Sequence, residues 1–379
     1  MRKFGAKLLE VLRKGDMVLL ALCVLTSVFG IVMVAASTAY DGSSRYVIIQ
    51  TGALITGILL YLALTAFDID ILAGQRTLLF LFNTAFLAML LVWGVEGTSG
   101  NKSWLHFPFL PFNIQPAEVC KITYIIILAK TMSLNRNRIS SLRSVGTLTF
   151  HMLWIVALIV VISHDTGVAL IFMFLFVVMA YVGGVSGWWF LGGAGAVAAV
   201  SPYLWKYFIR DDQKQRILAL IDPSIDPDGL GVLWQTNKSL EALRNGGLTG
   251  QGLLSGEHIF VPNAWNDFIF AYLANVLGFL GAAAVLLLLF ALCLRTLRTG
   301  LQCPDALGCN ICVGIFAALF LQCVINIGMN LQVLPVIGVT LPFFSAGGSS
   351  VVMMYLCVGI VLSVGMNTRR SKLEMQQIL

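Results

Sequence analysis

Long apolar segments recur along this chain, and they constrain its fold more than any other feature of the sequence. A helix needs about 20 mostly apolar residues to cross a hydrocarbon core of roughly 30 Å. Open sheets are excluded there, because their unpaired edges would have no hydrogen-bond partners in hydrocarbon. Hydropathy predicts ten spans, at residues 17–38, 46–67, 77–95, 116–133, 145–163, 166–184, 186–208, 267–295, 308–330 and 348–366. The sequence therefore predicts an all-α integral membrane protein of about ten transmembrane helices, with residues 1–379 in one domain.

Two of the predicted spans are unusual in composition. The seventh has a core of small residues, Gly192 to Ala196, which favours close packing against another helix. The first follows a basic segment and ends in Val34-Ala35-Ala36-Ser37, which resembles the cleavage site of a signal peptide. Because it is too long for the apolar region of a signal peptide, we expect it to be retained as a span.

The charged residues are few, and the basic ones lie in clusters. Hydrophobic residues make up 58% of the sequence and charged residues only 11%, too few for a soluble protein with a solvated surface. A net charge of +6 is compatible with nucleic-acid binding, but the basic residues lie between apolar segments rather than on one extended face. We therefore predict no nucleic-acid partner.

The basic clusters orient the chain, because Lys and Arg are enriched in the cytoplasmic loops of membrane proteins. With ten spans, they all fall on one side: the tail 1–16, the loop with Arg136, Arg138 and Arg143, the loop with Arg295 and Arg298, and the tail 367–379. Both termini are therefore predicted to be cytoplasmic. The other side receives residues 96–115, residues 331–347 and a large extracytoplasmic loop, 209–266, between the seventh and eighth spans. The chemistry of the protein is expected on that side.

Cysteine and histidine give no sign of a metal site. The eight cysteines lie mostly inside apolar stretches, where a thiol packs as a small hydrophobe. Cys309 and Cys312 form one Cys-x-x-Cys pair, which is short of the four ligands of a structural zinc site. The four histidines are scattered, so we predict neither a disulfide framework nor a histidine metal site.

Asp267 opens the eighth predicted span, where outer water would meet hydrocarbon. An acid at the start of a helix commonly caps it and interacts with the positive end of the helix dipole. Alternatively, partial desolvation raises the pKa of the carboxylate toward the working pH and fits it to take a proton from a hydroxyl group. Position alone leaves both interpretations open.

Two charged residues inside the fourth predicted span also have two interpretations. Glu118 and Lys121 are three residues apart, so they share a helix face and can form a structural ion pair. Alternatively, Lys121 faces a cavity and holds a diphosphate together with Arg216 or Arg210 of the large loop, since charged groups in a span usually face an interior site. In that case Lys121→Ala would weaken binding of the diphosphate-containing ligand more than Glu118→Gln would.

Irregular and polar backbone is predicted near the outer end of the ninth span, which ends in Asn326 to Asn330 and leads into a loop with Pro335 and Pro342. Such backbone is tolerated at membrane depth only where protein buries it or a cavity adjoins it. The glycine-dense segment 246–252 follows no predicted strand, so it lacks the context of an ATP-binding phosphate loop. Its backbone N–H groups can still approach an anionic group closely.

Several short motifs follow one another through almost the whole chain. They are Gly100-Asn101-Lys102-Ser103-Trp104, Ile114 to Lys121, Asp165-Thr166-Gly167-Val168-Ala169, Gln215-Arg216-Ile217 with Asp222-Pro223, Trp234-Gln235 with Ser239, Gly246 to Gly252, Asp267-Phe268-Ile269-Phe270-Ala271, Asn326 to Asn330, Leu334-Pro335-Val336 and Gly347-Gly348-Ser349-Ser350. Each motif is weak alone, but the ordered series is specific. It resembles the SEDS family of shape, elongation, division and sporulation proteins, the group of RodA, FtsW and SpoVE.

The resemblance implies a ten-helix peptidoglycan glycosyltransferase of the bacterial plasma membrane, which joins lipid II units into β-1,4 glycan strands. Such proteins usually work with a class B penicillin-binding protein, a transpeptidase. The family's essential aspartate corresponds to Asp267, which would be the general base of an inverting reaction that releases undecaprenyl diphosphate from the lipid-linked glycan. Cationic side chains, with or without Mg²⁺ or Mn²⁺, would stabilise the leaving group. The candidate substrate-binding residues are Lys121, Glu118, Arg216, Arg210, Trp104, Gln115, Gln235, Ser239, Asn330 and Ser349.

The segment before Asp267 departs from the family pattern. Many relatives read Leu-Pro-Glu-x-His-Thr-Asp where this chain has Asn263, Trp265 and Asn266 in place of Glu, His and Thr. Asn275 and Ala346 also replace a common glutamate and a common tyrosine. Two alternative functions are therefore kept: a transporter that flips lipid II, and a non-catalytic scaffold of a cell-wall synthesis complex. An acid at the outer rim rather than the bilayer midplane argues against the transporter.

Overall fold

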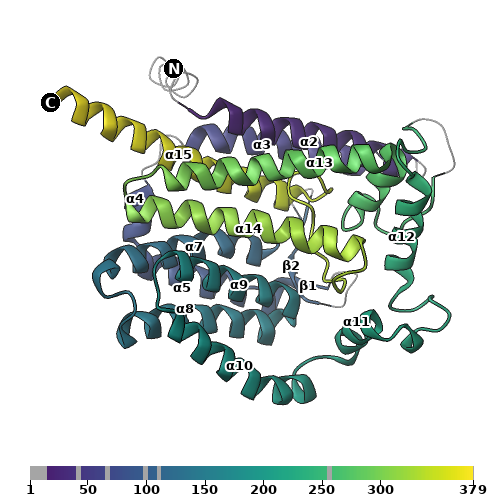
Figure 1. The fold of residues 1–379 in the computed structure, drawn as a ribbon, viewed down its shortest axis with the longest axis horizontal. Coiled ribbons are helices and arrows are strands. Elements are labelled where there is room, and N and C mark those ends of the chain that lie inside the picture. Colours follow the sequence, from purple (N-terminus) through teal and green to yellow (C-terminus); the bar gives the residue numbers. More distant parts are fainter. Residues whose placement is uncertain are drawn as a thin grey trace.

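Long helices running side by side dominate the computed structural model (Figure 1). It describes residues 15–39, 44–64, 69–96, 101–108, 112–253 and 258–378, with side chains through Thr368. The basic side chains of both predicted tails, and Gly100 of the first motif, lie outside this description. The helices are α2 (Met17–Thr38), α3 (Arg45–Leu64), α4 (Ile69–Gly74), α5 (Arg76–Ala88), α6 (Leu90–Trp93), α7 (Pro116–Leu134), α8 (Leu142–Leu158), α9 (Thr166–Val182), α10 (Gly187–Tyr207), α11 (Asp211–Ile221), α12 (Trp234–Gly246), α13 (Ile269–Leu301), α14 (Ala306–Asn330) and α15 (Gly348–Ile378).

A helix, or a pair of consecutive helical segments, begins and ends within a few residues of most predicted spans. The third predicted span is α5 continued by α6, and the fifth is α8 continued by a π-helical turn, η3 (Ile159–Ser163). Among the described residues, seven helical segments are long and apolar enough to cross a membrane, and α9 is a shorter apolar helix. The chain is therefore a multi-pass membrane protein, and the count of ten spans stays a prediction.

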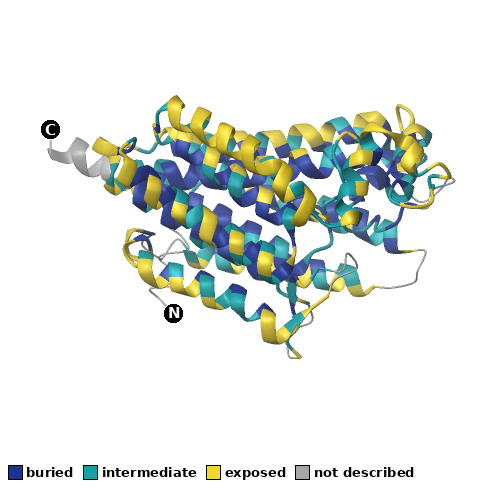
Figure 2. Ribbon diagram, turned by 90° about the horizontal axis from the view of Figure 1, so that it is seen from below, coloured by how far each residue is buried: buried dark blue, intermediate teal, exposed yellow. Residues whose placement is uncertain are grey.

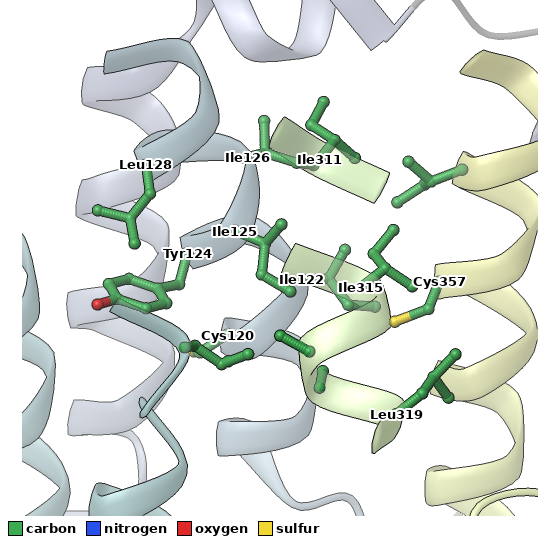
Figure 3. Packing of buried hydrophobic residues seen from close by; sticks show 14 of the residues in the cluster. Cys120, Ile122, Tyr124, Ile125, Ile126, Leu128, Ile311, Ile315, Leu319 and Cys357 are labelled. Carbon is green, nitrogen blue, oxygen red and sulfur yellow. The ribbon is translucent and has the colours of Figure 1, made fainter. Parts of the chain in front are cut away.

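The centre of the bundle is formed by α7, α14 and α15, whose apolar side chains interdigitate (Figure 3). Ile122 and Ile125 of α7 lie near Ile315 of α14, with Cys357 of α15 beside them. Buried residues run along these inner helices, and exposed ones follow the outside of the bundle (Figure 2). Many exposed residues are large and apolar, such as Leu59 at 61%, as expected of surfaces that face lipid rather than water.

Helix α10 does not pack as its small residues predicted. None of its residues is buried, and a β-carbon added to Gly192, Gly193 or Gly195 would meet nothing within 4 Å. In Figure 1 it runs along the edge of the molecule, below α8. Within the described part of the chain, the expected close contact of this glycine-rich segment with another helix is therefore wrong.

The two ends of the bundle differ. At one end, Asp16 before α2 pairs with Arg295 near the end of α13, at 2.7 Å, and a small cavity there also touches Thr368 of α15. The other end, at the right of Figure 1, carries α11, α12 and a short antiparallel pair, β1 (Gly94–Val95) with β2 (Trp104–Leu105). The loop 209–266 is thus partly helical, which its low hydropathy did not indicate.

Helix α13 is interrupted at Gly278, whose φ of 68° and ψ of −169° are not helical. The glycine segment 246–252 packs against this break. Backbone groups on both sides of the break have no partner within α13, and they form hydrogen bonds with the segment. The N–H groups of Gln251 and Gly252 donate to the carbonyls of Asn275 and Val276, and the N–H groups of Phe279 and Leu280 donate to the carbonyls of Gly247 and Leu248, at 2.8–3.1 Å. A β-carbon on Gly250 would clash with the carbonyl of Val276.

The segment 246–252 was expected to bring its backbone N–H groups close to an anionic group, but in the structure it contacts the backbone of α13. The N–H groups of Gln251 and Gly252 are already used by α13. The glycines instead allow two backbones to approach closely, and they fix the short outer half of α13, Ile269–Leu277, that follows Asp267.

Candidate active site

Asp267 does not cap the helix that it precedes. The residue at the N-cap of α13 is Phe268, and no side chain caps that helix. The Oδ1 atom of Asp267 is buried and has no hydrogen-bond partner, and among the described residues no Lys, Arg or His forms an ion pair with the carboxylate. The capping interpretation is therefore wrong, and the carboxylate is not engaged by a charged side chain of the described residues.

The backbone of Asp267 is held by two amides from the end of α14. Asn326 Nδ2 and Asn330 Nδ2 both donate to the carbonyl of Asp267, at 2.9 and 3.0 Å. Asn330 Oδ1 also accepts from the N–H of Ala271 in the first turn of α13, at 3.0 Å. The polar end of the ninth predicted span thus provides hydrogen-bond partners for backbone groups at the start of the eighth, as buried polar backbone requires.

The environment of Asp267 raises its pKa from the ordinary value of 3.8 to about 6, because burial disfavours the charged form. No nearby cation or donor to the carboxylate offsets that burial among the described residues. A carboxylate with a pKa near 6 is still mostly ionised at neutral pH, and it is a stronger base than an ordinary aspartate.

Asp267 lines a cavity of about 240 Å³ that is enclosed by several elements distant in the sequence. Four of the other predicted site residues line the same cavity: Trp104, Gln115, Arg216 and Gln235. Trp104 lies in β2, Gln115 lies directly before α7, Arg216 lies in α11 and Gln235 lies in α12. The remaining polar lining residues are Asn101, Ser103, Asp165, Thr166, Gln213, Asn263 and Asn266. One free carboxylate, one guanidinium, an indole and many amides therefore face one space.

Arg216 is the cationic member of this lining. Its Nη1 atom donates to the carbonyl of Val336, at 3.0 Å, so the guanidinium is anchored at one corner. A guanidinium has five N–H donors in a fixed planar arrangement, and the remaining donors suit an oxyanion such as a phosphate.

Lys121 and Glu118 lie outside the cavity lining. Lys121 Nζ donates to Glu118 Oε1 at 2.7 Å, and the two side chains are 1% and 9% exposed. Glu118 Oε2 has no partner among the described residues. Of the two interpretations of this pair, the geometry favours the structural ion pair, and a diphosphate role for Lys121 stays a prediction.

The other predicted site residues have structural contacts. Arg210 Nε bonds Asp212 and its Nη1 bonds Asn101 Oδ1, so it supports the cavity wall from behind. Ser239 is buried and donates to the carbonyl of Asn330 at 2.7 Å, which ties α12 to α14. Ser349 is buried in the first turn of α15.

Several lining residues were missed as site candidates. Asp165 caps α9, since its Oδ1 accepts from the N–H of Val168 and its Oδ2 accepts from Ser103 Oγ, at 3.1 and 3.0 Å. Burial raises its pKa, and these two hydrogen bonds oppose the rise. Asp165 stands in one of the family motifs, and Gln213 lies one helical turn before Arg216, so both carried a usable signal.

The residues that depart from the family pattern line the cavity or join neighbouring elements. Asn263 and Asn266 line the cavity. The ring of Trp265 stacks on Tyr46 of α3, with centroids 5.2 Å apart and an angle of 29° between the planes. Asn275 donates to the carbonyl of Ala242 and accepts from the N–H of Ile259, so it joins α13 to the large loop.

The lining does not have the composition of a metal centre. Among the described residues, no three His, Cys, Asp or Glu side chains are grouped so as to hold a metal ion. Of the two carboxylates at the cavity, Asp165 has both oxygens engaged by donors. Among the described residues, the lining therefore offers a metal ion only the one free carboxylate of Asp267.

The chain is also similar to known proteins. The model of the FtsW, RodA and SpoVE family, described as cell cycle protein, matches residues 16–370. Stage V sporulation protein E of Bacillus subtilis is 31% identical over 365 residues, which cover 93% of this chain and 98% of that protein. Peptidoglycan glycosyltransferase MrdB of Escherichia coli is 33% identical over 282 residues, which cover 73% and 74%.

Solved structures match as well. A chain from a peptidoglycan synthase complex that coordinates polymerisation and crosslinking has a TM-score of 0.78 and 27% identity, covering 93% of this chain and 98% of that one. A variant of the rod shape determining protein RodA of Thermus thermophilus has a TM-score of 0.70 and 25% identity, covering the same shares. From the extent of the family match, this chain belongs to the FtsW, RodA and SpoVE family of cell cycle proteins, the SEDS family.

Proposed function

We infer that this chain is a peptidoglycan glycosyltransferase that polymerises lipid II, with Asp267 as its general base. The observation that carries the proposal is the position of Asp267: an unpaired, partly buried carboxylate in a cavity whose other walls are rich in amides. Relatives named peptidoglycan glycosyltransferase support the same activity.

The reaction follows from these groups. The 4-hydroxyl of the acceptor sugar gives its proton to Asp267 while its oxygen attacks the anomeric carbon of the lipid-linked glycan. The bond from that carbon to the diphosphate breaks, and the electron pair leaves with undecaprenyl diphosphate. A single displacement turns an α-linked donor into a β-linked product, so it needs one base and no covalent enzyme intermediate.

The rest of the lining suits a sugar and a diphosphate. Amides such as Gln115 and Gln235 can both donate to and accept from hydroxyl and acetamido groups. Trp104 offers an apolar ring for a sugar face. Arg216, which is anchored through Val336, is the candidate to stabilise the charge that develops on the leaving diphosphate.

We further propose that α7, α9 and α10 also cross the membrane, which makes ten spans in one domain. The loop 209–266 then lies outside the cell, and both termini lie in the cytoplasm. The basic residues Arg295 and Arg298 support this orientation, because they line a small cavity near the end of α13, whereas Asp267 precedes the start of that helix.

A crosslinking transpeptidase of the class B penicillin-binding type is the proposed partner. The support is the similarity to a chain of a complex that coordinates polymerisation with crosslinking. A glycan strand is useful to the wall only after crosslinking, so a polymerase and a transpeptidase acting together are chemically consistent.

The test is polymerisation of purified lipid II by the reconstituted protein with its transpeptidase partner, comparing wild type with Asp267→Ala. We expect glycan strands from the wild type alone. Equal product from both proteins would reject the base assignment. Transport of lipid II by both proteins, without any polymer, would identify a flippase, and absence of both activities would leave a scaffold.

A further inference from the structure

Three consecutive backbone carbonyls around the proposed base are each held by a different donor. The N–H of Ala346 donates to the carbonyl of Trp265 at 2.8 Å, and Ser345 Oγ donates to that of Asn266 at 2.7 Å. The carbonyl of Asp267 accepts from the amides at the end of α14, as described above. The backbone that carries the carboxylate is therefore fixed by the loop before α15 as well as by α14.

That loop is itself held by one buried side chain of α3. Gln50, which is 1% exposed, donates from Nε2 to the carbonyl of Ser345 at 2.8 Å, and its Oε1 accepts from the N–H of Gly347 at 3.2 Å. The two polar atoms of the amide thus form hydrogen bonds with the residues on either side of Ala346. Because a buried polar group without a partner is costly, the amide and the loop fix each other.

A second contact joins α3 to the same segment. Tyr46 lies one helical turn before Gln50, so the two side chains share a face of α3. Tyr46 stacks on Trp265, the residue whose carbonyl Ala346 holds. Helix α3 therefore contacts Trp265 through an aromatic ring and the two neighbours of Ala346, Ser345 and Gly347, through an amide.

We propose that Gln50 is a positioning residue, which fixes the carboxylate of Asp267 through the loop 345–347. The proposal rests on the proposed function, in which Asp267 is the base. Gln50 touches neither the cavity lining nor any reacting atom, so it acts only through Ser345, Ala346 and the backbone of residues 265–267. Tyr46 supports the same segment from the side.

The test compares Gln50→Leu and Gln50→Glu with wild type in the complex with its transpeptidase partner. The leucine variant removes both hydrogen bonds, and the glutamate variant keeps only the acceptor for Gly347. Thr51→Val is the matched control, since Thr51 is the next residue of α3, is exposed, and its hydroxyl donates to the carbonyl of Val47 within the same helix. Lipid II polymerisation is measured as kcat and KM across pH.

We expect kcat to fall by about 100-fold in Gln50→Leu and about 10-fold in Gln50→Glu, because a small displacement of a catalytic group costs about that much. KM should change little, and the acidic midpoint of the kcat profile should move to lower pH, since a loosened carboxylate is better hydrated. The control should match wild type. A fall in kcat with an unchanged midpoint, or an unchanged kcat, would overturn the proposal.

Hydrogen exchange separates this proposal from the function on which it rests. Residues 263–268 and 341–348 should exchange faster in Gln50→Leu than in wild type or Thr51→Val, whether or not the protein polymerises lipid II. Unchanged exchange in both segments would reject the positioning role. Faster exchange in a protein whose wild type makes no polymer would reject only the proposed activity.

Discussion

Asp267 combines a carboxylate that has no cationic partner among the described residues with a backbone carbonyl that accepts two hydrogen bonds. The side chain can therefore be reactive while its position is fixed, as catalysis by a positioned base requires. The sequence could locate this residue through its place in a motif. It could not exclude a helix cap, because the residue at which α13 begins, and so the N–H groups that a cap would bond, depend on the folded backbone.

The pH dependence of polymerisation should report the protonation of Asp267. With its pKa raised to about 6, the base is lost as pH falls through that value, so kcat/KM, which reports the free protein, should drop by about tenfold per unit below it. Asp267→Asn should reduce kcat/KM by about 1000-fold at pH values above 6, and the variant should lack this acidic midpoint because its amide does not titrate. Asp222→Asn is the control, since Asp222 is fully exposed and hydrogen bonds from Ser224 lower its pKa, and it should keep the wild-type midpoint. A wild-type midpoint near the ordinary aspartate value of 3.8 would contradict the assignment.

The same burial predicts a stability effect of the opposite sign. The folded protein holds the proton of Asp267 up to about pH 6 and the unfolded chain only up to about 3.8, so stability declines as pH rises between these values. Asp267→Asn removes the buried charge. We expect it to have a higher Tm than wild type at a pH well above this range and nearly the same Tm near its lower end. A lower Tm of the variant at the higher pH would show that the carboxylate is stabilised by a partner.

The pair of Lys121 and Glu118 allows its two interpretations to be separated. Removing one member of a buried ion pair leaves an unpaired charge and costs about 3 kcal/mol or more. Lys121→Met and Glu118→Gln should therefore lower Tm, and the double variant should lower it less than Lys121→Met alone. The affinity of the folded protein for lipid II should stay within about twofold of wild type, a change of less than about 0.5 kcal/mol in binding free energy. A tenfold weaker affinity for Lys121→Met alone, about 1.4 kcal/mol, would restore the diphosphate role.

At the scale of elements, apolar spans were predictable and their interruptions were not. Hydropathy located α2, α14 and the others because a helix in lipid needs a long apolar run. The break at Gly278 depends on hydrogen bonds from the segment 247–252, which hydropathy does not contain. Helices α11 and α12 are short and polar, so they have no apolar run to detect, yet they bring Arg216 and Gln235 to the cavity.

Two glycine substitutions test that break. Gly278→Ala places a β-carbon against the backbone of Gly250 and Leu248 at a φ of +68°, so the loop must move away. We expect a marked fall in Tm and loss of polymerisation, because the outer half of α13 follows Asp267. Gly193→Ala in α10 is the control, since nothing lies within 4 Å and alanine is the better helix former. Equal Tm for the two variants would show that the contact with the glycine segment is dispensable.

At the scale of the whole molecule, the cavity lined by Asp267 lies at the start of α13, and the basic cluster of Arg295 and Arg298 lies near the other end of that helix. This polarity links topology to chemistry, because α11 and α12 supply Arg216 and Gln235 to the cavity that Asp267 lines. The proposal of ten spans then fixes which loops meet which solution. Residues after α7 and after α9 must face the cytoplasm, and those after α10 must face the outside.

Cysteine labelling tests this alternation in intact cells. Asn137, Gly187 and Ser224 are exposed and lie respectively after α7, at the start of α10 and after α11. In a background where the partly exposed Cys303 and Cys309 are serine, a membrane-impermeant maleimide should label Ser224→Cys directly. It should label Asn137→Cys and Gly187→Cys only after the membrane is permeabilised. Labelling of Gly187→Cys and Ser224→Cys from the same side would mean that α10 does not cross, and the cavity would then lack a defined outer face.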